Sequence, residues 1–409
     1  MEKGVHYPGT GRTGTFRLKN GVAIYGGFAG TESSRDARNW QANPTVLSGD
    51  VDRNDTTDAN GVVLTTTHIM GNNAYHVVTA ENAASTAVLD GFTVTAGKAD
   101  GSDSHSHGGG MYNSGGSPTL RNITFSGNQA SQNGGGMYNN NGNPTMSRVT
   151  FSNNSALRGG GMYNNSNPVL VNAFFNGNSS IIYGGGMYNS GGSPRLVNVA
   201  FNNNSARFIG CGGMNNAGGS PTLTNVVFGR NSGPGGGMCN DEVHLTLTNA
   251  TFSGNFTQYG SCGGMCNTQS IITMTNTILW GNRSTVTDTE EIYNDVSTIC
   301  TVSHSDIRGC GGSGSGWKTA CGIDGGGNID ADPLFVNADA GDLHLRENSP
   351  AIDAGLNSAV PAGITTDLDG NPRFVDFTGR GTAIVDMGAY EVQRPLPYHI
   401  YLPLVMRNR

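Results

Sequence analysis

Acidic residues near the N-terminus have a spacing that suits a hard cation. Five side chains with oxygen ligands lie close together in the sequence: Asp50, Asp52, Asn54, Asp55 and Asp58. Alternating carboxylate and amide oxygens are the ligands that Ca²⁺ prefers. The segment departs from an EF-hand loop, because it lacks the glycine at the sixth position and the glutamate at the twelfth. A structural Ca²⁺ site and a solvated acidic loop are therefore the two interpretations.

A second polar cluster spans residues 100–107 and combines two aspartates with His105 and His107. Two imidazoles at this spacing are able to bind a transition metal. A long polar loop inserted before the first repeat explains the same residues, and we favour the loop.

The middle of the chain lacks the groups that polysaccharide enzymes use. Polysaccharide lyases hold Ca²⁺ with carboxylates, and glycoside hydrolases use a pair of carboxyl groups as acid and base. Between Gly108 and Asn240 the sequence contains no Asp, Glu, Lys or His. We therefore expect no catalysis in this segment and assign no catalytic residue. Its charges are six arginines: Arg121, Arg148, Arg158, Arg195, Arg207 and Arg230.

Two motifs repeat in phase and define the element that positions these residues. A GGGMYN-like string recurs seven times at intervals of 24 to 27 residues, and a Phe-x-x-Asn-like string follows each methionine after 13 or 14 residues. A fixed period of this length indicates a solenoid. Gly, Asn, Pro and Ser interrupt every apolar run, which excludes helices of useful length. The methionines are Met111, Met137, Met162, Met187, Met214, Met238 and Met265.

Short alternating apolar and polar runs predict three strands in each repeat. In one repeat these are Gly136–Asn139, Pro144–Met146 and Val149–Phe151. An asparagine near the corner between the last two strands suits a left-handed backbone conformation, as at Asn122 or Asn172. We predict an all-β, right-handed parallel β-helix of roughly ten to thirteen turns, with about 25 residues in each turn.

Stacking of the turns at about 4.8 Å predicts ladders of identical side chains. Methionine and phenylalanine stacks would fill the core. Amides of equivalent asparagines would hydrogen-bond from turn to turn. These are Asn113, Asn139, Asn164, Asn189, Asn216, Asn240 and Asn267.

The candidate binding surface of the repeats is a flat outer face that carries a row of tyrosines and the arginines named above. One tyrosine per turn would place aromatic rings about 5 Å apart on an outer face, where they could stack on sugars. Tyrosine is also a common residue of exposed β-strands, and we favour this second interpretation. The row consists of Tyr112, Tyr138, Tyr163 and Tyr188.

Cysteine positions predict disulfides. Cys239 and Cys266 occupy the same position in neighbouring repeats, so stacking would bring them within disulfide reach. Cys310 and Cys321 flank a Gly/Ser-rich loop and form our second predicted pair. Seven cysteines leave at least one thiol free or intermolecular. A Zn²⁺ site is the alternative, which we disfavour because Cys262 and Cys266 lie along one strand without a neighbouring histidine.

These motifs resemble those of known surface proteins. The paired GGGM and Phe-x-x-Asn strings are similar to the repeats of polymorphic outer-membrane proteins, with Gly-Met in place of Ala-Ile. The C-terminal strings resemble the choice-of-anchor Q ending of bacterial surface proteins. The resemblance implies a pectate-lyase-like fold and, for most such proteins, no activity. Its residues are Gly21–Phe28, Leu47–Asp50, Asp332–Phe335, Ser349–Gly355, Asp367–Arg373 and Asp386–Glu391.

The motifs divide the chain into four segments. Residues 1–107 form N-terminal turns with acidic and histidine-containing loops, and residues 108–290 form the regular repeats. Residues 291–393 form irregular C-terminal turns, and residues 394–409 form a proline-containing tail that caps the solenoid or acts as a sorting signal. An uncapped end would expose strand edges and favour end-to-end assembly.

Composition limits the location and the partners. The 409 residues include 64 glycines, only 13% are charged, and the net charge is −7. A negative chain with few lysines does not suit nucleic acid, and no apolar run is long enough to span a membrane. The N-terminal residues lack the apolar core of a signal peptide, but composition and cysteine usage favour export.

We expect an extracellular or cell-surface structural or adhesive protein that binds a polysaccharide or cell-surface glycan. It would have no required cofactor besides the possible Ca²⁺. The alternatives are a polysaccharide lyase or hydrolase, with its site near Asp50–Asp58 or in the C-terminal turns, and a self-assembling filament subunit.

Overall fold

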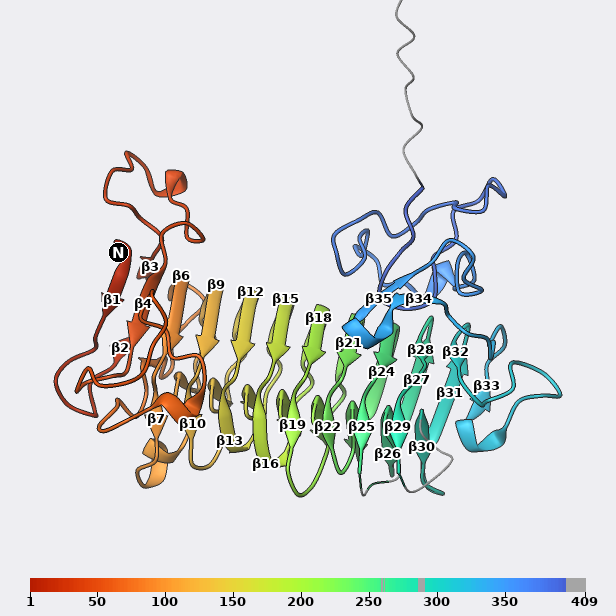
Figure 1. Ribbon diagram of the computed structural model, residues 1–409, viewed down its shortest axis with the longest axis horizontal. Helices are drawn as coiled ribbons and strands as arrows, with labels where there is room; N and C mark the ends of the chain where they lie inside the picture. The colour runs from red at the N-terminus through yellow and green to blue at the C-terminus, as the bar shows by residue number, and fades with distance from the viewer. Residues whose placement is uncertain (259, 261, 286–290, 395–409) are drawn as a thin grey trace, which may run out of the picture.

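The structure confirms the predicted all-β solenoid. A computed structural model describes residues 1–258, 260, 262–285 and 291–394. Three stacked parallel sheets run along one axis (Figure 1). The described helices are short 3₁₀ segments, none long or apolar enough to cross a membrane: η1 (Arg35–Ala37), η2 (Thr66–His68), η3 (Asp103–Ser106), η4 (Thr319–Cys321), η5 (Ala338–Ala340) and η6 (Asn357–Ala359). The tail predicted to cap the solenoid lies, from residue 395 onward, outside the described residues.

The first sheet, which we call the tyrosine sheet, holds the GGGMYN motif. Its ten strands pair in parallel and in register, so that Met111 lies beside Met137 and Tyr112 beside Tyr138. The strands are β2 (Phe16–Arg17), β5 (Val78–Thr79), β8 (Met111–Ser114), β11 (Met137–Asn140), β14 (Met162–Asn164), β17 (Met187–Ser190), β20 (Met214–Ala217), β23 (Met238–Asp241), β26 (Met265–Thr268) and β30 (Ile292–Asn294).

The second sheet, which we call the long sheet, holds eight-residue strands in its central turns. Each strand joins the two strands that the sequence predicts separately and bends between them. At the bend Asn122 and Asn172 have φ of 50° and 56°, the left-handed conformation expected there. The strands are β1 (Gly4–His6), β3 (Ala23–Tyr25), β4 (Thr45–Ser48), β6 (Val88–Thr95), β9 (Thr119–Ser126), β12 (Thr145–Ser152), β15 (Val169–Asn176), β18 (Arg195–Asn202), β21 (Thr222–Gly229), β24 (His244–Ser253), β27 (Ile271–Thr275), β28 (Ile278–Leu279), β31 (Ile299–Ser303), β32 (Asp306–Ile307) and β33 (Ile323–Asp324).

The third sheet follows the Phe-x-x-Asn motif and has very short strands, which the sequence analysis missed. They are β7 (Lys98–Ala99), β10 (Gln129–Ala130), β13 (Ser155–Arg158), β16 (Ser179–Tyr183), β19 (Ser205–Ala206), β22 (Ser232–Gly233), β25 (Phe256–Thr257) and β29 (Arg283–Ser284). Because this sheet has eight strands, the described residues contain eight complete turns. The expected ten to thirteen turns were too many, since the terminal strands contribute to only one or two sheets.

Stacked side chains of one type fill the interior. The seven repeat methionines are fully buried, and so are the repeat phenylalanines from Phe125 to Phe252. Neighbouring phenylalanine rings stack with centroids 4.6 to 5.0 Å apart. Burial of such side chains from water supplies the main stabilisation of the solenoid.

Three asparagine ladders connect the turns. The predicted ladder from Asn113 to Asn267 is buried, with amide-to-amide hydrogen bonds of 2.6 to 3.3 Å. A second ladder uses the motif asparagines from Asn128 to Asn282, at 2.7 to 3.0 Å. A third follows the bend asparagines from Asn172 to Asn276, at 2.9 to 3.0 Å. These bonds satisfy polar groups in the interior and fix the register of each turn.

Two lobes stand on the outer face of the long sheet. Residues 26–44, between β3 and β4, form the N-terminal lobe, and residues 332–392 form the C-terminal lobe (Figure 1). The C-terminal lobe contains the antiparallel hairpin of β34 (Phe335–Asn337) and β35 (Asp342–Leu345). It folds back over the solenoid: its apolar residues pack with Ala200, Val227 and Ile278 of the long sheet.

Candidate binding surface

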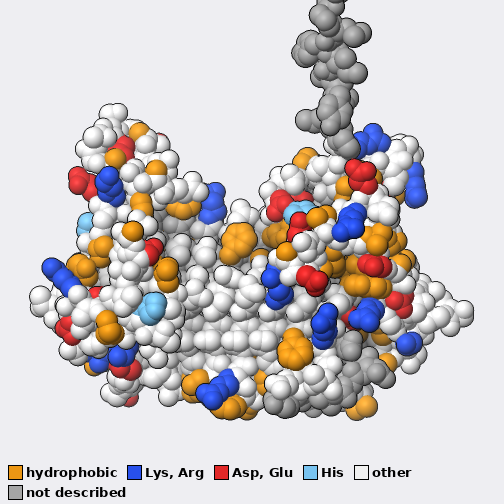
Figure 2. All heavy atoms as spheres, in the orientation of Figure 1, with side chains coloured by type: hydrophobic (Ala, Val, Ile, Leu, Met, Phe, Trp, Pro, Cys, Tyr) orange, Lys and Arg blue, Asp and Glu red, His pale blue; other side chains and the backbone are white. Residues whose placement is uncertain are grey.

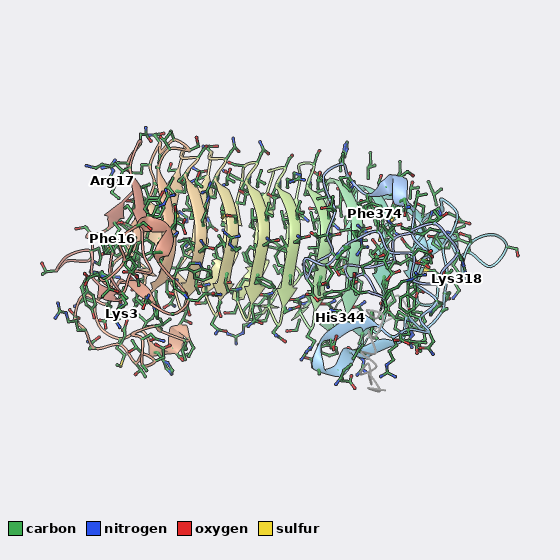
Figure 3. All side chains as sticks on the ribbon, turned by 90° about the horizontal axis from the view of Figure 1, so that it is seen from above. Lys3, Phe16, Arg17, Lys318, His344 and Phe374 are labelled. Atoms are coloured by element: carbon green, nitrogen blue, oxygen red, sulfur yellow. A yellow bond between two sulfur atoms is a disulfide. The ribbon has the colours of Figure 1, made fainter. Side chains whose placement is uncertain are left out.

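A saddle lies between the two lobes. Figure 2 shows the hollow in the space-filling view, and Figure 3 shows from above that the central strands of the long sheet are uncovered. We use the word saddle for the outer face of β9, β12 and β15 together with the facing sides of the lobes. Three neighbouring strands give the floor a width of about 10 Å between the outer strand axes.

The floor of the saddle carries arginines and an exposed aromatic ring. Arg121 on β9 and Arg148 on β12 are both exposed, and neither forms a salt bridge with a described residue. Phe174 on β15 is 48% exposed. Its neighbours in register, Thr150 and Ala200, are small or polar, so the ring stands alone on the face. The floor therefore offers positive charge and one apolar platform.

A chain of polar contacts orients one of these arginines. Arg38 of the N-terminal lobe forms a salt bridge of 2.8 Å with Asp90 of β6, and both side chains are largely buried. The Nδ2 of Asn122 donates to Asp90 at 2.7 Å, and the Nε of Arg148 donates to the Oδ1 of Asn122 at 2.6 Å. Arg148 is thus held through its Nε. The negative charge of Asp90 is balanced by Arg38.

The C-terminal wall carries a histidine held by two carboxylates. The Nδ1 of His344 lies 2.6 Å from Asp342, and its Nε2 lies 2.7 Å from Asp369. The ring also packs against Tyr390 at 4.1 Å. His344 lies on the side of the lobe that faces the middle of the molecule (Figure 3). Burial lowers the pKa of His344, but hydrogen bonds to Asp342 and Asp369 outweigh burial and raise the pKa above its usual value.

The C-terminal motifs converge on one buried arginine. Arg373 is fully buried, and its Nη2 donates to the carbonyl oxygens of Asp386 and Gly388 at 3.0 and 2.6 Å. The carboxylate of Glu391 lies 3.7 Å from its Nε. Asp367 accepts the backbone N–H of Glu391 at 3.0 Å. These residues from separate motifs therefore hold the C-terminal lobe together.

The predicted tyrosine row is present and half-buried. Rings of Tyr112, Tyr138 and Tyr163 stack on one another with centroids 5.4 and 5.2 Å apart, and Tyr188 meets Tyr163 edge-on at 5.6 Å. Burial, and then the neighbouring tyrosines, raise the pKa of Tyr138 to about 12. Because the ring faces are occupied by neighbouring rings, the row presents ring edges and hydroxyl groups to a ligand. His107 stacks on the same row, 4.7 Å from Tyr138.

The carboxylates of the acidic N-terminal segment accept hydrogen bonds from the backbone of that same segment. The carboxylate of Asp50 accepts the backbone N–H groups of Asn54 and Asp55, both at 3.1 Å. Asp52 and Asp58 accept other backbone N–H groups of the same insertion. Asp55 accepts from the backbone of Met70 at 2.5 Å and from Asn73. These contacts are those of a structured loop. The predicted Ca²⁺ site stays a prediction.

The disulfide pattern differs from the predicted one. Cys239 pairs with Cys211 and Cys266 pairs with Cys262, so the expected pair of Cys239 and Cys266 is wrong. A Cα spacing of about 4.8 Å between residues in register is compatible with a disulfide, so register alone does not decide the pairing. Cys211 and Cys262 lie within bonding reach of the same two cysteines, with Cα–Cα distances of 5.4 and 5.8 Å, and they take the bonds instead. The predicted pair of Cys310 and Cys321 is present. Cys300 is a buried thiol, and burial raises its pKa to about 12.

Sequence reasoning named the arginines but put them on the face of the tyrosine row, whereas Arg121 and Arg148 lie on the long sheet; it missed Phe174 and His344. Arg121, Arg148 and Phe174 were visible only as exceptions to the repeat, and the position of His344 depends on how the C-terminal lobe folds back. One signal was present in the sequence. The long-sheet position held by Thr124 and Thr150 becomes apolar at Phe174, Ala200 and Val227, and the last two of these are the residues that the C-terminal lobe covers.

Comparisons with known protein families, with curated proteins and with solved structures found no match. The fold and the side-chain ladders themselves define the class of the chain, a parallel β-solenoid repeat protein.

Proposed function

We propose that the protein is an extracellular adhesive scaffold that binds an acidic polysaccharide across the saddle. The observation that carries the proposal is the floor of the saddle, where Arg121 and Arg148 have no salt-bridge partner among the described residues. Complementary charge attracts an anionic ligand and orients it. Phe174 adds an apolar surface on which a sugar ring can pack.

The surroundings of the saddle support an acidic ligand over a neutral one. All six charged side chains between Gly108 and Asn240 are arginines. The nearest carboxylate on the N-terminal side, Asp90, is paired with Arg38. On the C-terminal side, Asp342 and Asp369 both contact His344, whose single positive charge balances one of the two carboxylates. A carboxylated polymer would therefore meet uncompensated positive charge on the floor.

An extracellular location is supported by three disulfides. The resemblance of the C-terminal motifs to the choice-of-anchor Q ending agrees with a place at the cell surface. A pectate-lyase-like relationship fits the same solenoid. The tyrosine row offers a second contact surface through its hydroxyl groups.

A panel of purified acidic and neutral polysaccharides tests the proposal. Binding and the release of cleavage products are measured in the same wells, with and without Ca²⁺. We expect the acidic polymers to bind without cleavage, and binding to weaken as salt rises because salt screens exposed charges. Cleavage of any polymer would contradict the scaffold and indicate a lyase or hydrolase. Equal binding of neutral polymers would contradict the role of the arginines.

A further inference from the structure

Four cysteines gather where the tyrosine row ends. In register with Tyr188, the next three turns carry Asn215, Cys239 and Cys266 in place of tyrosine. Four residues before Asn215 and Cys266 lie two more cysteines, Cys211 and Cys262. Two positions of the repeat therefore carry cysteine within three consecutive turns, which brings the four residues together.

The sulfur atoms surround one glycine. The Sγ atoms of Cys211, Cys239 and Cys266 all lie within 4.8 Å of one another. Cys262 joins the group through its bond to Cys266. Gly235 pairs with Cys211 on the neighbouring turn. A Cβ atom on Gly235 would overlap the Sγ atoms of Cys211 and Cys239 and lie 3.4 Å from that of Cys266. Only glycine leaves space for this sulfur cluster.

We propose that Cys211, Cys239, Cys262 and Cys266 form a tetrathiolate metal site for Zn²⁺ when their two disulfides are reduced. Zn²⁺ takes four cysteine thiolates in a tetrahedron with Zn–S bonds of about 2.3 Å, which places the sulfurs about 3.8 Å apart. The sulfurs of Cys211, Cys239 and Cys266 already lie within 4.8 Å of one another, and Cys262 supplies the fourth sulfur once its bond to Cys266 is reduced. The Cα atoms of the two bonded pairs are 5.4 and 5.8 Å apart, so ligation asks for rotation of side chains and little movement of backbone.

In the structure, Cys262 and Cys266 do not need a neighbouring histidine to complete a Zn²⁺ site. Cys262 and Cys266 alone offer two ligands and have no neighbouring histidine. The fold adds Cys211 and Cys239 from the two preceding turns, which completes a four-sulfur set. Cys211 and Cys262 are buried, while Cys239 and Cys266 are partly exposed and provide access for the metal. The site is independent of the saddle and of glycan binding.

A phosphine can reduce the two disulfides before Zn²⁺ binds. Each disulfide takes two electrons from one phosphine, and water supplies the oxygen of the phosphine oxide and the two thiol protons. Binding of one Zn²⁺ by four thiols then releases four protons, because the thiolate is the ligand form. The disulfide form of the protein belongs to an oxidising environment and the metal form to a reducing one.

Co²⁺ serves as the probe, because its visible spectrum reports tetrahedral thiolate ligation. The full chain is reduced with a phosphine, freed of reductant without oxygen, and titrated with Co²⁺ and then Zn²⁺. We expect one equivalent of Co²⁺ with tetrathiolate bands, displacement by one equivalent of Zn²⁺, and protection of four thiols from a thiol reagent. Circular dichroism verifies that the solenoid stays folded.

Matched variants locate the site. The Cys239→Ser/Cys266→Ser variant removes two ligands and should lose the bands. The Cys310→Ser/Cys321→Ser variant removes the other disulfide and should keep them. Gly235→Ala keeps every sulfur and should weaken Zn²⁺ binding at least tenfold. The proposal is overturned if the folded, reduced chain shows no tetrathiolate spectrum, or if the bands survive in the first variant or vanish in the second.

Discussion

Replacement of Asn178 by alanine tests whether the asparagine ladders hold the solenoid. Asn178 is fully buried in the second ladder. Its Oδ1 accepts the backbone N–H and the Nδ2 of Asn154 at 3.1 and 2.9 Å. Its Nδ2 donates to the carbonyl oxygen of Phe151 and to Asn204, both at 2.9 Å. The alanine variant removes all four bonds at once.

The expected loss follows from the groups left without a partner. The backbone N–H of Asn154 loses its acceptor, and the carbonyl of Phe151 loses a donor, in a region that water does not reach. Each buried unsatisfied group costs about 1 to 3 kcal/mol. We therefore expect the free energy of unfolding to fall by about 2 to 6 kcal/mol. The side chains of Asn154 and Asn204 each keep one other bond, so they add little.

Guanidinium unfolding followed by circular dichroism measures the change. Asn176→Ala is the matched control, since Asn176 lies two residues earlier and is exposed, and its side chain accepts only from Asn203 among the described residues. A surface change of this kind costs about 0.5 kcal/mol or less. Equal losses in the two variants would refute the reasoning that buried amide bonds between turns stabilise the fold.

Three further predictions concern buried and paired charges. Burial, followed by the charges of nearby aspartates, raises the pKa of Asp306 from 3.8 to about 8, so stability falls as the pH rises through that window. The melting temperature of Asp306→Asn should therefore equal that of the natural protein at pH 4 and exceed it at pH 9. The same difference in melting temperature at both pH values would contradict this. The raised pKa of His344 stabilises the C-terminal lobe at low pH, and this contribution is lost as the pH rises through the folded pKa. Hydrogen-exchange protection factors in the lobe, which remove the intrinsic pH dependence of exchange, should fall over that range in the natural protein but not in His344→Gln. The same fall in both proteins would argue against the histidine. Arg373→Met removes the hydrogen bonds that Arg373 donates to the carbonyl oxygens of Asp386 and Gly388, and each buried acceptor left without this donor costs about 1 to 3 kcal/mol. The variant should therefore destabilise the lobe, measured by limited proteolysis; equal protease resistance would rule out a structural role for the arginine.

The repeated part of the fold was predictable because its signals are local. Each repeat carries the same inward methionine and phenylalanine, so the period alone determines which side chains stack. The left-handed bend at Asn122 also follows from the residue type. The short strands of the third sheet have two to five residues, too few to show an alternating pattern.

The saddle was not predictable, because it depends on contacts between distant segments. The C-terminal lobe packs on Ala200 and Val227, more than a hundred residues earlier in the chain. No local pattern in residues 332–392 indicates that these residues pack on the long sheet. The prediction of a Cys239–Cys266 disulfide failed for a different reason. The repeat pattern indicates that the two residues are in register, but it does not indicate toward which neighbouring cysteine each side chain points.

The binding of an acidic oligosaccharide by the saddle variants tests the central claim most directly. Isothermal titration compares the natural protein with Arg121→Gln/Arg148→Gln and with the tyrosine-sheet control Tyr138→Phe/Tyr163→Phe. Loss of two charge-assisted contacts at an exposed site, at about 0.5 to 1 kcal/mol or more each, should weaken binding about tenfold. The control should bind like the natural protein. Unchanged affinity in the arginine variant, or a loss confined to the tyrosine variant, would contradict the assignment of the saddle as the binding surface.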